Sequence, residues 1–431
     1  MAPPLQFRTP RQGRDNGVSA RHVVVMVTTS YPRFPGDSVG TFMEPIAKHV
    51  AAIGHEVHVV APWHPLLRRG REEDGVFFHF FKYAPLRALN VFGYAAGMRA
   101  DVKVRGTAWA ATPLALSAGW FKALRVAQKR RATVMHGHWV VPGGTIAAAA
   151  RPSLPLVISL HGSDVFVAER NGVAGAVARR VFRRAGYVTA CSEDLAARAE
   201  HLGADRNRLE VVPYGVDIVR FRPEASNRDA LRARAKAAPG QPLVVAAGRL
   251  VRKKGFEYLI DALPLVSTEP RPVLAIAGGG DLDDELRARA GRAGVADSVV
   301  FLGNLTQDEV GEWFSAADVV AAPSVRDDSG NVDGLPNTVL EALASGTPLV
   351  ATAAGGIGSV VHDGRTGLIV PERDAMRLAR AIETLLGDKP AAARLGSAGR
   401  ALVEAQFGWR RVAERFSEAY DRALAFKIRG H

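Results

Sequence analysis

Cysteine is almost missing from this 431-residue sequence, in which Cys191 stands alone. Intramolecular disulfides and cysteine-cluster metal sites are therefore excluded, and a lone cysteine fits a reducing compartment. No apolar run approaches the roughly 18 residues of a membrane span. Residues 1–20 contain arginines but lack the apolar core of a secretory signal. We therefore expect a cytoplasmic protein.

Signatures of nucleic-acid binding are also missing: zinc-finger spacing, an aromatic RNP-like strand and a long Lys/Arg tract. Lys and Arg nevertheless outnumber Asp and Glu by 56 to 43, a net charge of +13, which favours phosphorylated substrates or an anionic membrane face. Aromatic residues stand beside cations at 77–82 and 120–122. These segments suit peripheral binding at the inner face of a membrane, but buried strand residues beside surface cations explain them equally well.

The composition is that of a soluble globular protein, and the length exceeds what one hydrophobic core supports. Short apolar runs alternate with longer helical segments, which indicates parallel sheets covered on both faces. The first set of predicted strands is 23–27, 57–61, 133–136, 156–160, 187–190 and 209–212. The second set is 243–247, 273–277, 298–302, 318–322, 348–351 and 367–370. The fold class is therefore α/β, with two Rossmann-like doubly wound domains facing a central cleft.

The predicted division of the chain follows these two sets of strands. A polar stretch with several charges and no clean apolar period separates them, and apolar residues at helical spacing end the chain. The predicted parts are a disordered tail at 1–20, a first domain at 21–215, a linker at 216–241, a second domain at 242–405, and a C-terminal helix at 406–431. We expect that helix to pack back on the first domain.

A basic loop follows the predicted strand 243–247. It begins at Gly248 and contains Arg249 and Lys254. A fixed guanidinium and ammonium at the carboxyl end of a strand can stabilise a departing diphosphate without a metal. A solvated basic loop is the alternative.

The segment 333–352 has the pattern of a loop, a helix, a tight turn and a strand. Gly334 and Pro336 open the helix, so the free backbone N–H groups of Asn337 and Thr338 form an anion site. Asp333 and Glu341 flank that site, and carboxylates accept hydrogen bonds from vicinal hydroxyls. Alternatively, Asp333 caps the helix and Glu341 is a surface residue.

These two segments resemble the G-R-x4-K-G and E-x7-E patterns of the family 4 glycosyltransferases. The resemblance covers most of the chain, in order: Gly40-Thr41-Phe42, Gly54-His55-Glu56-Val57, His136-Gly137-His138-Trp139, His161-Gly162-Ser163-Asp164, Pro213-Tyr214-Gly215-Val216-Asp217 and Ala354-Gly355-Gly356-Ile357. It implies a GT-B fold, a retaining hexosyl transfer, an N-terminal acceptor domain and a C-terminal domain for a nucleotide-diphosphate sugar. It also implies no divalent metal and no cofactor.

Carried over by position, the resemblance assigns Arg249 and Lys254 to the donor diphosphate and Glu341 to the ribose. Asp333 would hold the hydroxyls of the transferred sugar, but the family usually has Glu there, so the identity of the sugar stays open. The remaining donor-side residues would be Gly40, Gly248, Gly334, Leu335, Asn337 and Thr338.

In the first domain, His161 resembles the active-site histidine of the family, and it follows the predicted strand 156–160. Asp164 and His138 are placed on the acceptor side. Asp164 would serve equally well as a helix cap, and His136 with His138 lacks the third ligand of a catalytic zinc site.

The predicted function is transfer of a sugar to an acceptor hydroxyl, in cell-surface glycan or glycolipid synthesis. The predicted partners are the donor, a glycan or lipid-linked acceptor and an anionic membrane surface. A GT-B sugar-nucleotide epimerase and a catalytically silent nucleotide-sugar-binding or scaffold protein are the alternatives. The nucleotide base, the sugar, the acceptor, its linkage and the oligomeric state have no signature in these residues.

Overall fold

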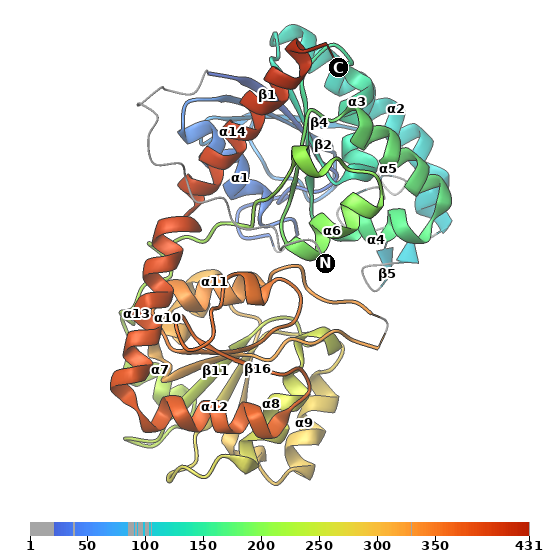
Figure 1. Cartoon of the computed structure of the whole chain (residues 1–431). Helices are drawn as coiled ribbons and strands as arrows, with labels where there is room; N and C mark the ends of the chain where they lie inside the picture. The colour runs from blue at the N-terminus through green and yellow to red at the C-terminus, as the bar shows by residue number, and fades with distance from the viewer. Residues whose placement is uncertain are drawn as a thin grey trace. The chain divides into compact units, whose positions relative to one another are not determined.

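The chain forms two compact units (Figure 1). The computed structural model describes residues 21–37, 39–84, 90, 93, 98–99, 103–104, 106–328 and 330–430. The first unit contains the residues up to Pro213 and those from Trp409 onward, and the second unit spans Tyr214–Gly408. The predicted tail at 1–20 lies outside the described residues.

The first unit is built on a sheet with the strand order β10-β9-β8-β7-β1-β2-β4-β3. All neighbours in it are parallel except β3 and β4, and the buried strand β1 lies in its interior. The strands are β1 (Val23–Val27), β2 (Glu56–Pro62), β3 (Glu72–Glu73), β4 (Val76–Phe81), β7 (Val134–His138), β8 (Leu156–Leu160), β9 (Tyr187–Ala190) and β10 (Leu209–Val211). A separate antiparallel pair is formed by β5 (Met98–Arg99) and β6 (Lys103–Val104).

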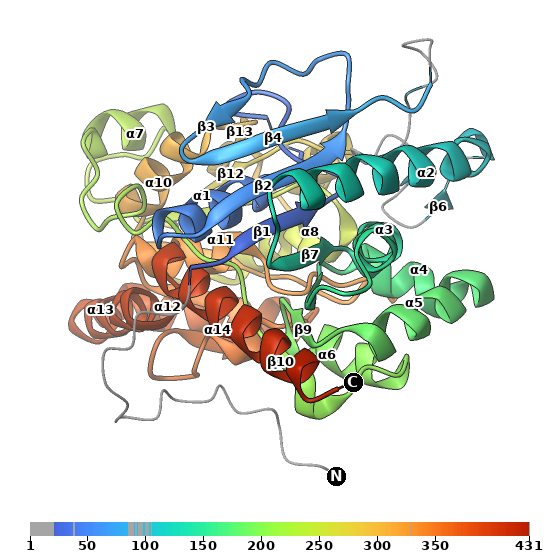
Figure 2. The ribbon, with the colours of Figure 1, turned by 90° about the horizontal axis from the view of Figure 1, so that it is seen from above.

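Helices cover both faces of this sheet. They are α1 (Met43–Ala52), α2 (Gly106–Lys129), α3 (Thr145–Ala150), α4 (Ser163–Arg170), α5 (Gly172–Arg184), α6 (Glu193–His201) and α14 (Trp409–Ile428), with the short turns η2 (Val140–Gly144) and η3 (Arg206–Arg208). Figure 2 shows α1 and α14 on one face, and α2, α3 and α5 on the other.

The second unit has an all-parallel sheet with the order β13-β12-β11-β14-β15-β16. Its strands are β11 (Leu243–Ala247), β12 (Val273–Ala277), β13 (Val299–Gly303), β14 (Val319–Ala322), β15 (Leu349–Thr352) and β16 (Leu368–Val370). Its helices are α7 (Arg228–Arg234), α8 (Phe256–Ala262), α9 (Asp283–Arg292), α10 (Gln307–Ala316), α11 (Asn337–Ala344), α12 (Ala375–Gly387) and α13 (Lys389–Gln406), with short turns η4 (Arg252–Lys254), η5 (Leu263–Leu265), η6 (Ala296–Ser298) and η7 (Ile357–Ser359). Apolar side chains of the central strands and of α8, α9 and α12 form its core.

A strand is present at every one of the predicted positions in both sets. The predicted α/β class with two parallel doubly wound sheets is therefore confirmed. Continuous apolar strands are readily recognised because both faces of a parallel sheet are buried.

The stretch 216–241, which we expected to be a linker, belongs to the second unit and contains α7. Its first residue is fixed there, because the backbone N–H of Val216 donates to the carbonyl of Phe407 at 2.9 Å. The C-terminal helix α14 belongs to the first unit, where Phe416 and Tyr420 are buried. The Tyr420 hydroxyl lies 3.0 Å from Nδ1 of His136 on β7, so polar contacts also fix this helix to the sheet.

The aromatic segment 77–82 is not a membrane surface. It forms most of β4, which pairs with β2 in the sheet, and Phe78 and Phe81 are buried there. In contrast, Trp120 and Phe121 on α2 are 40% and 53% exposed. No helix in the described part of the chain is both long and apolar enough to span a membrane.

Candidate active site

Two loops meet at the carboxyl ends of β11 and β14 in the second unit. Gly255 ends the basic loop in a left-handed conformation (φ 65°), and a Cβ there would lie 2.0 Å from the carbonyl oxygen of Pro323. The backbone N–H of Val325 then donates to the carbonyl of Lys253 at 2.9 Å. Glycine at this position therefore lets the basic loop lie directly against the loop that leads to Asp333.

A cluster of one carboxylate and two ammonium groups results. Asp333 Oδ1 lies 2.9 Å from Lys253 Nζ, and Asp333 Oδ2 lies 2.7 Å from Lys254 Nζ. The side chains of Asp333, Lys253 and Lys254 are only 17%, 11% and 14% exposed. Burial alone would raise the pKa of Asp333, but the charges of Lys254 and Lys253 together outweigh it and hold that pKa well below its usual range. The cluster carries a net charge of about +1, so it attracts an anion.

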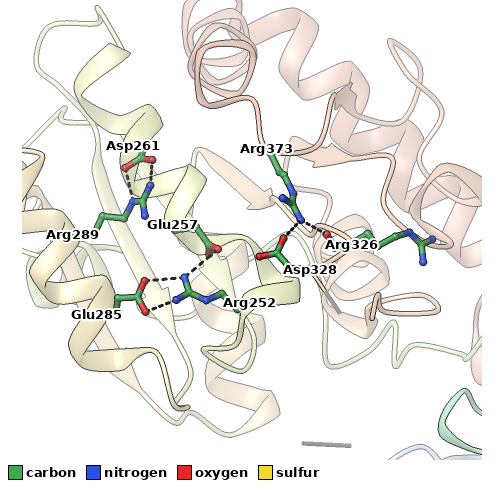
Figure 3. A network of polar contacts seen from close by, with 8 residues as sticks. All are labelled: Arg252, Glu257, Asp261, Glu285, Arg289, Arg326, Asp328 and Arg373. Carbon is green, nitrogen blue, oxygen red and sulfur yellow. Dashed lines mark hydrogen bonds and ion pairs between the residues drawn. The ribbon is translucent and has the colours of Figure 1, made fainter. Parts of the chain in front are cut away.

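Lys253 was not predicted as a site residue, although it stands in the same basic run as Lys254. The geometry of η4 determines which of the neighbouring cations faces Asp333. Arg252 turns away and pairs with Glu285 on α9 at 2.6 and 2.8 Å, with Glu257 close by (Figure 3). Sequence position alone could not separate these three cations.

The loop before Asp333 is anchored by a second polar network in Figure 3. Arg373 Nη2 lies 2.9 Å from Asp328 Oδ1 and donates to the carbonyl of Arg326 at 2.7 Å. The backbone N–H of Arg326 donates to Glu372 at 2.7 Å. These contacts fix the loop between β14 and α11, so the position of Asp333 does not depend on its lysine contacts alone.

Glu341 lies on α11, eight positions after Asp333 as the E-x7-E pattern requires. Its side chain is buried, and among the described residues it has no hydrogen-bond or ion-pair partner. Burial raises its pKa to about 7, although Lys254 and Arg220 lower it. A buried carboxylate without donors is costly, so this group is suited to accept hydrogen bonds from a ligand.

The other predicted donor-side residues lie around this cluster. Gly334 accepts a hydrogen bond from the N–H of Gly356 at 2.5 Å, and the side chain of Leu335 is buried. Asn337 and Thr338 begin α11, where the first amide groups have no acceptor within the helix. A Cβ on Gly248 would lie 3.2 Å from Lys254 Cε, and Arg249 is exposed at the end of β11.

In the first unit, His161 follows β8 and contacts His138, which ends β7. His161 Nε2 lies 3.0 Å from His138 Nδ1, and the ring of His161 stacks on Phe42 at 4.6 Å. Phe42 belongs to the loop of Gly40, which has a φ of 66°, so three predicted segments converge on His161. Trp139, with its ring 4.7 Å away and an unusual φ of 61°, completes the cluster; it stands in the quoted His136–Trp139 motif but was not predicted as a site residue.

Both imidazoles are neutral near pH 7. Burial lowers the pKa of His138 to about 3, and burial together with His138 lowers that of His161 well below its usual range. Nε2 of His138 is buried, and none of the described residues forms a hydrogen bond with it. Because buried unpaired N–H groups are rare, we assign the proton of His138 to Nδ1, which then donates to His161. His161 in turn carries its own proton on Nδ1, as a hydrogen-bond donor.

Asp164 does not present its carboxylate to a ligand. Its oxygens accept the backbone N–H groups of Val140 at 2.8 Å, Gly162 at 3.0 Å and His161 at 3.3 Å. Burial raises its pKa, and these amide donors counteract that shift. Asp164 does not cap α4, which has no side-chain cap hydrogen bond; its carboxylate instead joins Val140 to the turn at His161 and Gly162.

His136 contacts α14 and lies 2.7 Å from Ser159 Oγ, so both its ring nitrogens are occupied. Among the described residues, no group of three or more His, Cys, Asp or Glu side chains is arranged to hold a metal ion.

Comparisons with known proteins identify the family of this chain. The family model described as glycosyl transferases group 1 matches residues 227–402, and that described as Glycosyltransferase Family 4 matches residues 39–220. A GDP-mannose-dependent alpha-(1-6)-phosphatidylinositol monomannoside mannosyltransferase of Mycobacterium tuberculosis is 36% identical over 281 residues, which are 65% of this chain and 71% of that protein. A glycogen synthase of the same species is 29% identical over 416 residues, 92% of this chain and 94% of that one.

Solved structures show the same fold. A sucrose-phosphate synthase from Thermosynechococcus elongatus matches with a TM-score of 0.72 at 22% identity, over 94% of this chain and 100% of that one. Anabaena Alr3699/HepE in complex with UDP matches with a TM-score of 0.73 at 20% identity, over 93% and 99% of the two chains. At these identities the likeness concerns the fold alone.

Proposed function

Because this chain belongs to the family 4 glycosyltransferases, we propose that it transfers a hexose from a nucleotide-diphosphate sugar to an acceptor hydroxyl with retention and without a divalent metal. The observation that carries the proposal is the largely buried cluster of Lys253, Lys254 and Asp333. Glu341 lies beside it without a partner among the described residues. The second unit thus supplies both positive charge that can bind a diphosphate and carboxylates that can accept hydrogen bonds from hydroxyl groups.

In the proposed donor complex, Lys254 exchanges its partner. Without donor, its ammonium lies on Asp333. A bound diphosphate carries more negative charge than one carboxylate, so it draws Lys254 and Arg249 to its oxygens. Lys253 then continues to neutralise Asp333, which stays ionised and accepts hydrogen bonds from the transferred sugar. The first amides of α11 add hydrogen bonds to the phosphate oxygens.

Glu341 is proposed to accept the two ribose hydroxyls. Hydrogen bonds from hydroxyl donors favour the ionised carboxylate and lower its pKa from about 7. Donor binding would therefore convert Glu341 from a partly protonated group into an ionised one at neutral pH.

The reaction step needs no enzymic nucleophile. The bond between the anomeric carbon and the phosphate oxygen breaks, the acceptor oxygen bonds to the same face of that carbon, and the acceptor proton passes to the departing phosphate oxygen. Lys254 and Arg249 stabilise the charge that develops on the diphosphate, which is the role otherwise given to a metal ion. Neutral His161 is suited to donate its Nδ1–H to a hydroxyl of the sugar.

The acceptor is proposed to be a glycolipid or cell-surface glycan intermediate at an anionic membrane face. The mannosyltransferase relative has a phosphatidylinositol mannoside in its name, and this chain carries a net charge of +13. On α2, the exposed rings of Trp120 and Phe121 lie beside cations, with the Arg125 guanidinium 5.5 Å from the centre of Phe121. Aromatic and cationic groups together bind such a surface.

The test is transfer by the purified full chain, starting with GDP-mannose because a relative uses it. Labelled donor is offered with phosphatidylinositol mannosides in vesicles, with EDTA or with Mg²⁺, and the anomeric configuration of the product is determined by NMR. We expect an α-linked product from an α-linked donor, with equal rates in EDTA and Mg²⁺. An inverted product, or activity lost in EDTA, contradicts the mechanism. An isomerised donor without acceptor identifies an epimerase, and nucleotide binding with no turnover of any donor identifies a silent protein.

A further inference from the structure

The first unit has a cavity at the edge of its sheet opposite His161. It lies where β8 and β9 begin, next to the last residues of α5 and the C-terminal end of α14, and has a volume of about 540 Å³. β8 begins at Leu156 and His161 follows it, so the two places are about 16 Å apart. Small-molecule sites typically occupy about 300–1,000 Å³. The cavity is thus large enough for a ligand and separate from the proposed active site.

Positive charge dominates the lining of this cavity. The cations are Arg183, Arg184, Arg208 and Lys427, and the carboxylate is Asp205. Asp205 is already paired, because Arg208 Nε lies 2.9 Å from its Oδ2. No ion pair is found for Arg183, Arg184 or Lys427 among the described residues. About three positive charges therefore face this space without a compensating anion from the first unit.

Arg184 is the most informative of these residues. Its Nη2 donates to the carbonyl oxygens of Arg151 at 2.9 Å and Leu154 at 3.3 Å, which fixes the guanidinium at the cavity. Its Nη1 is buried and has no hydrogen-bond partner in the part of the chain that the structure describes. Burial lowers the pKa of Arg184, with no nearby carboxylate to counteract the effect. A partly buried guanidinium without a counter-charge is unfavourable by itself, so the site is built for an anion.

Helix electrostatics do not account for this arrangement. Arg183 and Arg184 stand in the last turn of α5, where cations are favourable near the helix carbonyls. That effect explains an exposed Arg183 but not the buried, unpaired Nη1 of Arg184. The same effect favours Lys427 in the last turn of α14, so the buried Nη1 of Arg184 is the observation that points to an anion.

We propose that this cavity binds the phosphate or diphosphate group of a ligand. Guanidinium and ammonium groups bind phosphate oxygens through charge-assisted hydrogen bonds, and the carbonyl contacts of Arg184 fix its positive charge at the cavity. Leucine and proline side chains line the same cavity and leave room for an uncharged body next to the phosphate. The phosphate comes from a lipid headgroup or from a soluble phosphorylated compound. The proposal does not depend on the donor site, because no residue of the second unit takes part in it.

The experiment is titration calorimetry of the full chain with inorganic pyrophosphate. We expect two sites in the parent, one in this cavity and one at Lys254. Arg183→Gln/Lys427→Gln should weaken only the cavity site, by about tenfold or more, because two charge-assisted hydrogen bonds are lost. Lys254→Met should remove only the other. The matched control Arg180→Gln/Lys389→Gln removes the same charge at exposed positions outside the cavity and should retain both sites.

The proposal is wrong if the parent binds pyrophosphate at a single site and Lys254→Met loses that site. It is also wrong if Arg183→Gln/Lys427→Gln binds pyrophosphate at two sites with unchanged affinity. Arg184→Gln serves as a second test, with thermal unfolding checked first because its side chain holds two carbonyls. Flotation with phosphatidylglycerol and phosphatidylcholine vesicles then separates the two sources of phosphate. Weaker binding of the cavity variant to the anionic vesicles identifies a lipid headgroup, and unchanged flotation identifies a soluble phosphate compound.

Discussion

Replacing Lys253 or Lys254 with methionine tests the proposed exchange of partners. The two ammonium groups lie 2.9 and 2.7 Å from the same carboxylate, and their side chains are 11% and 14% exposed. Each substitution removes one hydrogen bond to a charged group and leaves the other lysine on Asp333. Both variants should therefore lose a similar free energy of unfolding, about 1.5–3 kcal/mol. Stability alone does not separate the two residues.

The kinetic constants of Lys253→Met and Lys254→Met should differ. Lys254 is proposed to stabilise charge on the departing diphosphate, so Lys254→Met should cost about 2.7–4 kcal/mol of transition-state stabilisation, roughly 10²–10³ in kcat. Lys253→Met leaves Lys254 held by Asp333 and should mainly raise KM for the donor, by about tenfold. Lys389→Met, on the exposed surface of α13, is the matched control.

The assay is initial-rate kinetics with labelled donor at saturating acceptor, together with thermal unfolding of each variant. Equal losses of kcat in Lys253→Met and Lys254→Met would refute the exchange, because the two lysines would then act only as a structural pair. A loss of kcat confined to Lys253→Met would refute the assignment of Lys254 to the diphosphate.

Three further predictions follow from the titrating groups. Glu341 keeps its proton to about pH 7 in the fold but loses it near pH 4.5 when unfolded, so stability falls as pH rises between these values. Glu341→Gln should remove this pH dependence and raise the free energy of unfolding at pH 8 by at most about 3 kcal/mol. It should also lower the affinity for the nucleotide. If thermal unfolding of Glu341→Gln between pH 4 and 8 still shows the pH dependence, the assignment to Glu341 is wrong. The pKa of Asp333 is lowered in the fold, so its carboxylate stabilises the folded state above the unfolded pKa of about 3.9. This stabilisation is lost as pH falls through the lower folded pKa. Acid unfolding of Asp333→Asn should therefore lack this loss of stability. His138→Phe should lower kcat/KM by about tenfold and shift the proton of His161 from Nδ1, as read in long-range ¹H–¹⁵N spectra; an unchanged tautomer contradicts our assignment.

The positions of most strands along the chain were predictable from sequence. Both faces of a parallel sheet are buried, so each strand is a short apolar run that stands out between helices, as in 243–247 and 273–277. The proximity of Asp333 to the basic loop also followed from order along the chain. Both segments follow parallel strands, and carboxyl ends of parallel strands lie at one edge of the sheet.

Tertiary packing decided which segments are buried and which of the neighbouring basic side chains face the site. For the segment 77–82, a membrane surface and a buried strand fitted the sequence equally well, and the pairing of β4 with β2 buries Phe78 and Phe81. Which of three adjacent cations faces Asp333 depended on the turn η4 and on Glu285, 33 positions away from Arg252.

The sequence by itself thus determined the class of each segment and the residue types at the donor site, because periodicity and motif spacing are local properties. Only the folded chain gathered Arg184 and Lys427 around one cavity. Such contacts join segments more than two hundred residues apart. They depend on the fit of complete surfaces, for which no short stretch of sequence carries a signal.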